Sequence, residues 1–478
     1  MGIMESSPDF EEARARTMTT LLSLVDMSME AKDKLLKALY QEAGKQKFLL
    51  GMHESLYTSL TVRQDASTDM WTKGFSGLYD HVKEANLSRD IEQMGGMLRY
   101  FENKAVLGVI QHANLNMMGK NRYDDMLITN NLQTIKDDVH AAFPIQEARR
   151  YIKFAVAAYG DNGIISANLD LNQAIDLRGG SLTKTRISEY TGIPIDDIEV
   201  IAVDYGDGPN ELSHFVAVDH AHKKIILAIR GTHTHKLCNF PGYTKEFLGG
   251  EAHVGIAMMA ENLWKSVGYC VIRLLHENPW YELIVTGHSL GGGVTCLVNM
   301  LLHKDERMRG HQFRCFAYGS PPVYSPLSFV HSSVTTTCIT FVNQHDSVPF
   351  TSGDSVRHQM AMINVVEHLD LDLMQRARLI LGLDSPNAQV VKQIHTMERE
   401  PWRVLPDVPR GIPRGLGCPS MATIWIVSSE NEGNDDMFEY VLVDPQKVAS
   451  AALYVHKNNF NDHLPARYEF ALNHIKSE

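Results

Sequence analysis

The sequence has 478 residues, enough for about three domains if a domain holds roughly 150 residues. Hydrophobic residues make up 44%, charged residues 21% and aromatic residues 8%, a mix typical of globular proteins that excludes a disordered or fibrous chain. The 45 basic and 57 acidic residues give a net charge of −12, which argues against a broad surface for nucleic acid.

Residues 1–143 carry helical periodicity and almost no strand signal, so we predict an α-helical N-terminal region that ends near Phe143-Pro144. Met97, Leu98 and Phe101, for example, share one helical face. Two features could bring this region to a membrane. Residues 1–6 fit a myristoylation pattern, and the lysines between residues 32 and 47 accompany leucines as in a basic interfacial helix, although a packed helix with a solvated lysine face is the alternative.

Residues 144–478 alternate helices with near-continuous apolar strands, which predicts an α/β domain with a mostly parallel central sheet. The alternation breaks at about residues 351–420, an insertion that ends in a Pro-, Gly- and Arg-rich irregular passage. The predicted strands are 214–219, 224–229, 281–286, 312–318, 337–342, 423–427 and 438–443, and the predicted helices are 148–158, 254–276, one from residue 290, 365–383 and 465–474.

The run of residues 283–302 contains no Asp, Glu, Lys or Arg, and its hydropathy resembles that of a membrane span. Glycines around His288 and Ser289 divide it into a β-branched half and a helical half. We therefore interpret the run as a buried strand, a tight turn and a buried helix.

The turn within this run is the G-x-S-x-G pattern, Gly287-His288-Ser289-Leu290-Gly291, between a strand and a helix. Small residues allow a serine on a strained turn, and the following helix N-terminus offers backbone N–H groups to a developing oxyanion. The pattern predicts Ser289 as a nucleophile, with Gly287, His288 and Gly291 in the nucleophile elbow. An ordinary glycine-rich turn is the alternative.

A serine nucleophile needs a base and an orienting carboxylate, which follow it along α/β-hydrolase-type chains in the order Asp or Glu, then His. Asp346 lies just past the end of a predicted buried strand, where open α/β sheets place their sites, and Asp354 is the reserve. Among the later histidines we favour His463, in a polar loop before the last helix, over His474 near that helix's end.

The oxyanion of an ester-cleaving serine enzyme needs two backbone donors. The first is the N–H of Leu290, after the nucleophile, and the second is predicted at Thr232, which follows the strand 224–229.

Several motifs, taken in order, resemble the class 3 lipases: RGTHT at 230–234, AHVG at 252–255, GHSLGGG at 287–293, YGSPPV at 318–323, the strand end at Asp346 and DHLP at 462–465. The resemblance covers about residues 145–478 and is greatest to the branch that includes the sn-1-type diacylglycerol lipases. It implies an α/β-hydrolase fold, ester hydrolysis without a cofactor, a triad of Ser289, Asp346 and His463, and an oxyanion hole of Thr232 and Leu290.

The sequence departs from that family in two places. After RGT the loop continues HKLCNFPGY at 235–243, where many relatives have acidic residues. The membrane-bound diacylglycerol lipases carry transmembrane helices before the catalytic domain, and residues 1–143 show none, so membrane integration is not carried over.

We therefore expect a serine hydrolase that cleaves acylglycerol esters; a phospholipase, a general carboxylesterase and a catalytically silent scaffold are the alternatives. Lipid substrates need an apolar cleft that a segment covers, and residues 233–251 and 351–420 are the candidates, with the longer one predicted as a lid. A peripheral contact with a membrane or lipid droplet and the oligomeric state stay open.

Cysteine usage predicts the compartment. Six scattered cysteines are too few for a disulfide scaffold, and no CxxC pair indicates a metal site. Cys270, Cys296, Cys315 and Cys338 lie in apolar runs, where a reduced cysteine acts as a small hydrophobe. Because the N-terminus lacks the pattern of a secretory signal, we expect a reducing, cytoplasmic location.

Overall fold

The computed structural model describes residues 97–128, 145–159, 184–204, 212–231, 244–380, 382–399, 415–428, 437–456, 458–459 and 461–476. Several predicted features lie wholly or mostly outside these residues: the myristoylation pattern, the lysine-rich segment, the Phe143-Pro144 joint, Thr232, the loop 233–251 and the irregular passage of the insertion.

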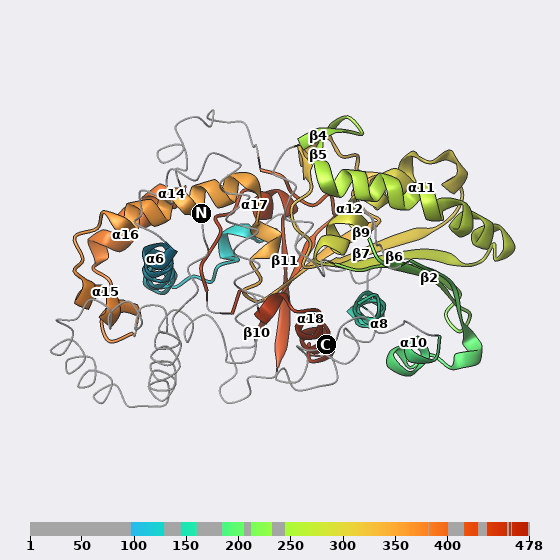
Figure 1. Ribbon diagram of the computed structural model, residues 1–478, viewed down its shortest axis with the longest axis horizontal. Helices are drawn as coiled ribbons and strands as arrows, with labels where there is room; N and C mark the ends of the chain where they lie inside the picture. Colours follow the sequence, from blue (N-terminus) through green and yellow to red (C-terminus); the bar gives the residue numbers. More distant parts are fainter. Residues whose placement is uncertain are drawn as a thin grey trace, which may run out of the picture.

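An eight-stranded sheet runs through the molecule in the order β1-β2-β3-β6-β7-β9-β10-β11 (Figure 1). The pairs from β3 to β10 are parallel, whereas β1, β2 and β11 join their neighbours antiparallel. The strands are β1 (Ile198–Asp204), β2 (His214–Asp219), β3 (Lys224–Ile229), β6 (Glu282–His288), β7 (Phe313–Tyr318), β9 (Cys338–Asn343), β10 (Thr423–Ser428) and β11 (Phe438–Val443). A separate three-stranded sheet contains β4 (Thr244–Phe247), β5 (Gly250–His253) and β8 (Tyr324–Ser325).

Helices cover both faces of the large sheet (Figure 1). One face carries α11 (Val254–Glu277) and α12 (Leu290–Lys304), and the other carries α8 (Ile145–Ala157), α10 (Lys184–Thr191) and α18 (Pro465–Asn473). The remaining helices are α6 (Met97–Met118), α13 (Ser332–Thr335), α14 (Gly353–Glu367), α15 (Leu373–Ile380), α16 (Ala388–Arg399) and α17 (Pro445–Ala449). This is the α/β-hydrolase fold that the sequence predicts.

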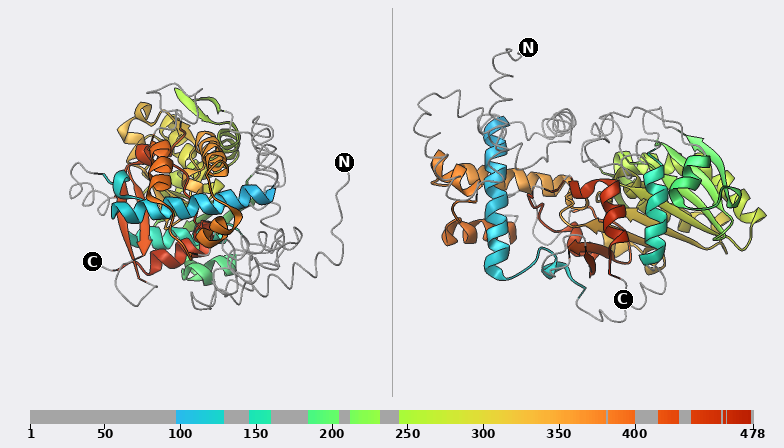
Figure 2. Two further views of the ribbon diagram at one scale, coloured as in Figure 1. Left: turned by 90° about the vertical axis from the view of Figure 1, so that its left-hand side faces the viewer. Right: turned by 90° about the horizontal axis from the view of Figure 1, so that it is seen from below.

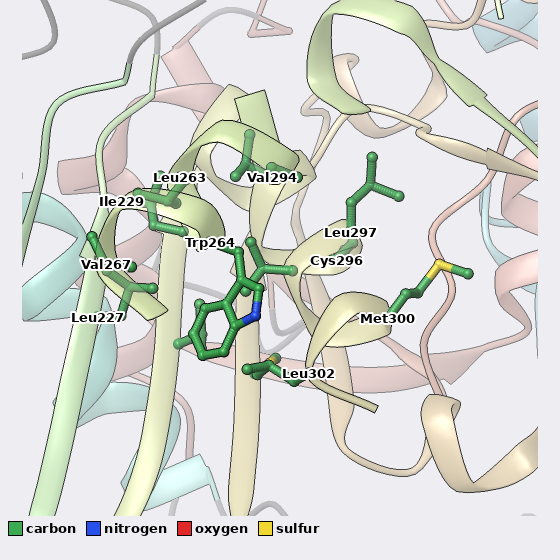
Figure 3. Close-up of a cluster of buried hydrophobic side chains, with 14 of the residues drawn as sticks. Leu227, Ile229, Leu263, Trp264, Val267, Val294, Cys296, Leu297, Met300 and Leu302 are labelled. Carbon is green, nitrogen blue, oxygen red and sulfur yellow. The ribbon is translucent and has the colours of Figure 1, made fainter. Parts of the chain in front are cut away.

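Alternate residues of a central strand face opposite helical layers. In β3, Leu227 and Ile229 pack in the cluster that contains Trp264 of α11 (Figure 3), whereas Ile226 and Ala228 pack in the cluster beside α8. Both faces are therefore buried, which explains why the strand is apolar throughout rather than alternating.

The uncharged run at 283–302 forms most of β6, the turn at Ser289 and most of α12, so the interpretation as strand, turn and helix is confirmed. Among the described residues, none of the helices combines the length and apolar character that crossing a membrane requires. The described cysteines form no disulfide, and burial raises the pKa of the Cys315 thiol.

The predicted helix at 365–383 is wrong in extent. In the structure α14 starts twelve residues earlier, at Gly353, where the Ser352 and Ser355 side chains form a capping box, and it ends at Glu367. A new helix then begins because Asp372 and Gln375 exchange backbone and side-chain hydrogen bonds at its N-terminus. Strands β1, β4, β5 and β8 and helices α10 and α16 were not predicted. Strands β4, β5 and β8 have only two to four residues and carry little periodicity, and β1 shows no alternation of buried and exposed residues.

The insertion packs against α6, the one described long helix of the predicted N-terminal region (Figure 2). Leu107 and Ile110 of α6 lie in a buried cluster with Ile363 of α14 and Ile394 of α16. Buried amide groups add specific contacts: Gln111 donates to Glu398 at 2.5 Å. The helix and the insertion thus form one layer, while the domain boundary near residue 143 stays a prediction.

This packing changes how a lid could be tested. A deletion of residues 385–415 would remove α16 and uncover the apolar cluster that α6 shares with α14. A point substitution in the cluster is a cleaner probe of the layer, and the lid role stays a prediction.

We predict that Leu107→Ala lowers the free energy of unfolding by about 2–5 kcal/mol, because Leu107 is fully buried and its removal leaves a cavity. Met117→Ala is the control on the same helix, because Met117 is 62% exposed and should change stability by no more than about 0.5 kcal/mol. Urea denaturation of the full chain, followed by circular dichroism, measures both. Equal stability of the two variants would contradict the packing of α6.

Candidate active site

Ser289 occupies a strained turn between β6 and α12. Its φ of 59° and ψ of −127° lie outside the regions that most L-residues adopt. Its backbone N–H donates to the carbonyl of Tyr318 at 2.8 Å, which fixes the turn against the end of the neighbouring strand β7. The structure therefore has the sharp strand-to-helix turn that the G-x-S-x-G pattern predicts.

Two glycines make this turn possible. A Cβ on Gly287 would lie 2.3 Å from the Gly291 carbonyl oxygen, and a Cβ on Gly291 would lie 2.4 Å from the Ile229 carbonyl oxygen. No side chain fits at either position, so α12 can approach the carboxyl ends of β3 and β6 only because both residues are glycine.

Ser289, His463 and Asp346 lie in one hydrogen-bonded chain. The Nε2 atom of His463 is 2.8 Å from Ser289 Oγ, and its Nδ1 atom is 2.9 Å from Asp346 Oδ2. Because an ionised carboxylate only accepts hydrogen bonds, Nδ1 carries the ring proton and Nε2 is left to accept from the serine hydroxyl. The histidine is thus oriented to remove the serine proton.

The Asp346 carboxylate is fully buried and receives two further hydrogen bonds. The hydroxyl of Tyr468 donates to Oδ2 at 2.6 Å, and the backbone N–H of Val348 donates to Oδ1 at 2.8 Å. Together with His463, these donors replace the water that a buried carboxylate loses.

Two loops hold the base and the carboxylate together. Asp346 follows β9, and His463 ends the short 3₁₀ helix Asn461–His463 directly before α18. Asn343 Nδ2 donates to the Asp462 carbonyl at 2.9 Å, and the His345 backbone N–H donates to the Asp462 carboxylate at 3.1 Å. The distance between Asp346 and His463 is therefore set by these loop contacts as well as by their own hydrogen bond.

The structure separates the chosen residues from their alternatives. Asp354 lies in the first turn of α14 and pairs with Arg357. His474 follows α18, is exposed, and hydrogen-bonds through Nδ1 to the Phe470 carbonyl oxygen of its own helix. Neither side chain is recorded in contact with Ser289.

Of the two predicted oxyanion donors, only Leu290 is described. It is the first residue of α12, and the first backbone N–H groups of a helix have no partner within the helix. Its position next to Ser289 suits the predicted role. Thr232 lies outside the described residues, so its role stays a prediction from the sequence. In the described part of the chain, no three His, Cys, Asp or Glu side chains gather as metal ligands.

Burial shifts the pKa of two groups beside the triad. Burial, followed by the charge of His463, lowers the pKa of His288 well below its usual value. Burial, with a contribution from Asp346, raises the pKa of Asp462 to about 7. Both groups therefore favour their uncharged forms in slightly acidic solution.

Part of the chain matches a known protein family. Residues 226–356, from within β3 to within α14, match the family model described as "Lipase (class 3)". These residues are therefore similar to the class 3 lipases. The segment contains Ser289 and Asp346 and ends before His463. The predicted resemblance to class 3 lipases is confirmed for it.

Individual relatives also match part of the chain. Secreted mono- and diacylglycerol lipase 1 of Fusarium solani is 32% identical over 114 residues, which are 23% of this chain and 33% of that protein. Diacylglycerol lipase-alpha of Homo sapiens is 32% identical over 141 residues, 26% of this chain and 13% of that protein. The chain thus spans a third or less of the length of these two relatives. The solved lipase II from Rhizopus niveus is 23% identical, with a TM-score of 0.34 and coverage of 43% of this chain and 74% of that one.

Sequence reasoning missed three residues around the candidate triad: Tyr159, Asp462 and Tyr468. Tyr159 lies just after α8, and Tyr468 lies within α18, far away along the chain. A lone tyrosine in a helical pattern is more often a core residue than a partner of a carboxylate, and no spacing marks these two. Asp462 had a weak signal, because it directly precedes His463 in the DHLP motif.

We predict that Asp462→Asn alters how stability depends on pH. With its pKa raised to about 7, folded Asp462 keeps its proton in a window where the unfolded chain, with a pKa near 4, has lost it. The stability that this group contributes is full below about pH 4 and is lost as pH rises through about 7. Asparagine does not ionise and escapes this loss.

The melting temperature of Asp462→Asn, relative to the wild type, should therefore be higher at pH 8 than at pH 5. Thermal unfolding of the full chain at both values measures the difference. Asp370→Asn removes one negative charge at an exposed position and serves as the control. If the difference in melting temperature between Asp462→Asn and the wild type is the same at pH 5 and pH 8, the raised pKa of Asp462 is contradicted.

Proposed function

We propose that the protein is a serine hydrolase of carboxylic esters that acts through a covalent acyl-enzyme. The observation that carries this proposal is the hydrogen-bonded chain from Ser289 Oγ through the His463 ring to Asp346. This arrangement favours a catalytic role for the serine, because a structural hydroxyl needs only a nearby carbonyl group as its hydrogen-bond partner.

The geometry defines the path of the proton. As Ser289 Oγ attacks the ester carbonyl carbon, its proton passes to His463 Nε2, and Asp346 stabilises the resulting imidazolium. The negative charge moves to the carbonyl oxygen, which accepts from the Leu290 N–H and, as the sequence predicts, from Thr232. When the ester C–O bond breaks, Nε2 returns the proton to the leaving alcohol.

The acyl-enzyme is then hydrolysed by the same groups in reverse roles. His463 takes a proton from a water molecule, and the hydroxide oxygen attacks the acyl carbon. The tetrahedral intermediate collapses, the bond to Ser289 Oγ breaks, and the proton returns to the serine. The products are an alcohol and a carboxylic acid, and no step needs a cofactor.

We propose acylglycerols as the substrate class, in line with the names of the relatives: a secreted mono- and diacylglycerol lipase and a diacylglycerol lipase-alpha. Phospholipids and simple carboxylic esters are the competing classes. The cytoplasmic location, a peripheral contact with membranes or lipid droplets and the lack of a nucleic-acid partner stay predictions from the sequence.

We predict that Ser289→Ala abolishes labelling by a fluorophosphonate probe and lowers kcat on a p-nitrophenyl ester by about 10³-fold or more, because the attacking oxygen is lost. His463→Ala and Asp346→Asn should also lower kcat strongly. Each has a matched control in the same chain: His474→Ala for the histidine and Asp354→Asn for the carboxylate. Both controls should keep near-wild-type activity, because neither side chain reaches the serine.

Other outcomes distinguish the alternatives. A folded wild-type chain that neither labels nor hydrolyses the ester would show a catalytically silent scaffold. With an active chain, mass spectrometry of lipids released from mixed vesicles identifies the substrate class. Loss of diacylglycerol or triacylglycerol with a gain of fatty acid supports the proposal, and release of lysophospholipid would replace it by a phospholipase.

A further inference from the structure

The ring of His288, directly before Ser289, is joined to the candidate base through the protein interior. This ring is only 1% exposed and lies with its centroid 4.8 Å from that of the His463 ring. Its Nε2 atom is 2.7 Å from the His463 carbonyl oxygen, and its Nδ1 atom is 2.8 Å from the Tyr159 hydroxyl. The strained turn at Ser289 requires the small residues Gly287 and Gly291. It does not require an imidazole ring with two hydrogen-bond partners at residue 288.

The partners determine where the His288 proton lies. The His463 carbonyl oxygen can only accept a hydrogen bond, so Nε2 of His288 carries the proton and donates it. Nδ1 of the neutral ring then has a free lone pair, and the Tyr159 hydroxyl donates to it. This arrangement satisfies both ring nitrogens without a positive charge.

The third member, Tyr159, connects this pair to the end of β3. The Gly231 backbone N–H hydrogen-bonds the Tyr159 hydroxyl, which agrees with that hydroxyl donating its own proton to His288. A Cβ on Gly231 would lie 2.2 Å from the Tyr159 hydroxyl oxygen, so the glycine leaves room for it. A polar chain thus runs from Gly231 through Tyr159 and His288 to the main chain of His463.

We propose that His288 is a positioning residue, held neutral by Tyr159, that fixes the main chain of His463 so that its ring faces Ser289. This inference rests on the proposed hydrolase function. Position matters here because proton transfer needs Nε2 of His463 within hydrogen-bond reach of the serine, and a shift of about 1 Å can cost about 10²-fold in rate.

Neutrality matters because His463 becomes an imidazolium during the proposed reaction. A positive charge on His288, one ring away in a buried site, would oppose that step. The groups that face His288 are Tyr159 after α8, His463, and Tyr468 of α18, whose ring centroid is 5.5 Å from that of His288. Tyr468 in turn donates to the Asp346 carboxylate. Burial and the neighbouring His463 lower the pKa of His288, which agrees with a neutral ring.

Two substitutions at residue 288 distinguish the loss of the hydrogen bond to His463 from the loss of the imidazole ring itself. The amide nitrogen of glutamine can take the place of imidazole Nε2, so His288→Gln keeps a donor for the His463 carbonyl. The shorter His288→Asn reaches only the place of Nδ1, so it keeps a partner for Tyr159 and loses the donor to His463. Tyr159→Phe leaves His288 in place and removes the group that holds its tautomer.

The experiment measures kcat and KM on a p-nitrophenyl ester from pH 5 to 9, together with the rate of fluorophosphonate labelling and the melting temperature. We expect His288→Asn to lower kcat about 10- to 100-fold with KM nearly unchanged, and His288→Gln to recover most of that loss. Tyr159→Phe should lower kcat by a smaller factor of about 3 to 10, with the largest deficit at low pH, where the released His288 ring is protonated most easily.

The outcomes are distinguishable. If the wild type labels and turns over while the Asn and Gln variants both match it, His288 has no positioning role. If kcat falls equally in the two variants, in proportion to the fall in their melting temperatures, His288 contributes to stability alone. Tyr159→Phe keeps the test decisive if His288→Asn does not fold, since an unchanged pH profile in that variant overturns the inference. A wild type that neither labels nor turns over contradicts the proposed function instead.

Discussion

The turn at Ser289 is the constraint on which the rest of the site depends. A non-glycine residue with a φ of 59° is tolerated only where the surroundings hold it, and here a hydrogen bond to the Tyr318 carbonyl and the close contact of two glycines do so. The same contacts place α12 against β3 and β6, and α12 contributes side chains to the apolar cluster around Trp264. The position of the serine oxygen and the packing of α12 therefore depend on the same contacts. This dependence explains why a run without charges is needed on both sides of the turn.

The other half of the site comes from a different part of the chain and is assembled by polar contacts. The loops after β9 and before α18 are joined by Asn343, His345 and Asp462, while Tyr468 and His288 hold the carboxylate and the main chain of the base. Because these groups are buried, each hydrogen bond left unmade would cost about 1–3 kcal/mol, which favours a single arrangement of the loops. Apolar packing brings the elements together, and these polar contacts define the distances between them.

The sequence predicted the parts of the fold in which local pattern and tertiary environment agree. Strands 214–219 and 224–229 have their predicted bounds because they are buried on both faces, so the residues between their polar ends carry the same apolar signal. The three triad candidates could be chosen because chain order and strand ends restrict them, and the structure brings those three side chains together. The packing of α6 on α14 and α16 could not be foreseen, since Gln111 and Glu398 are 287 positions apart and neither carries a local signal. Tyr159 and Tyr468 were missed for the same reason.

The charge state of the site's surroundings links stability to the proposed chemistry. A buried pair of imidazolium and carboxylate is favoured when nearby groups add no opposing charge, and a neutral His288 meets that condition. Asp462 acts differently: as pH rises through about 7 it gains a negative charge near His463, which costs folding stability because the group is buried. The two buried groups beside the triad therefore differ in their charge: burial keeps His288 neutral, whereas Asp462 loses its proton as pH rises through about 7.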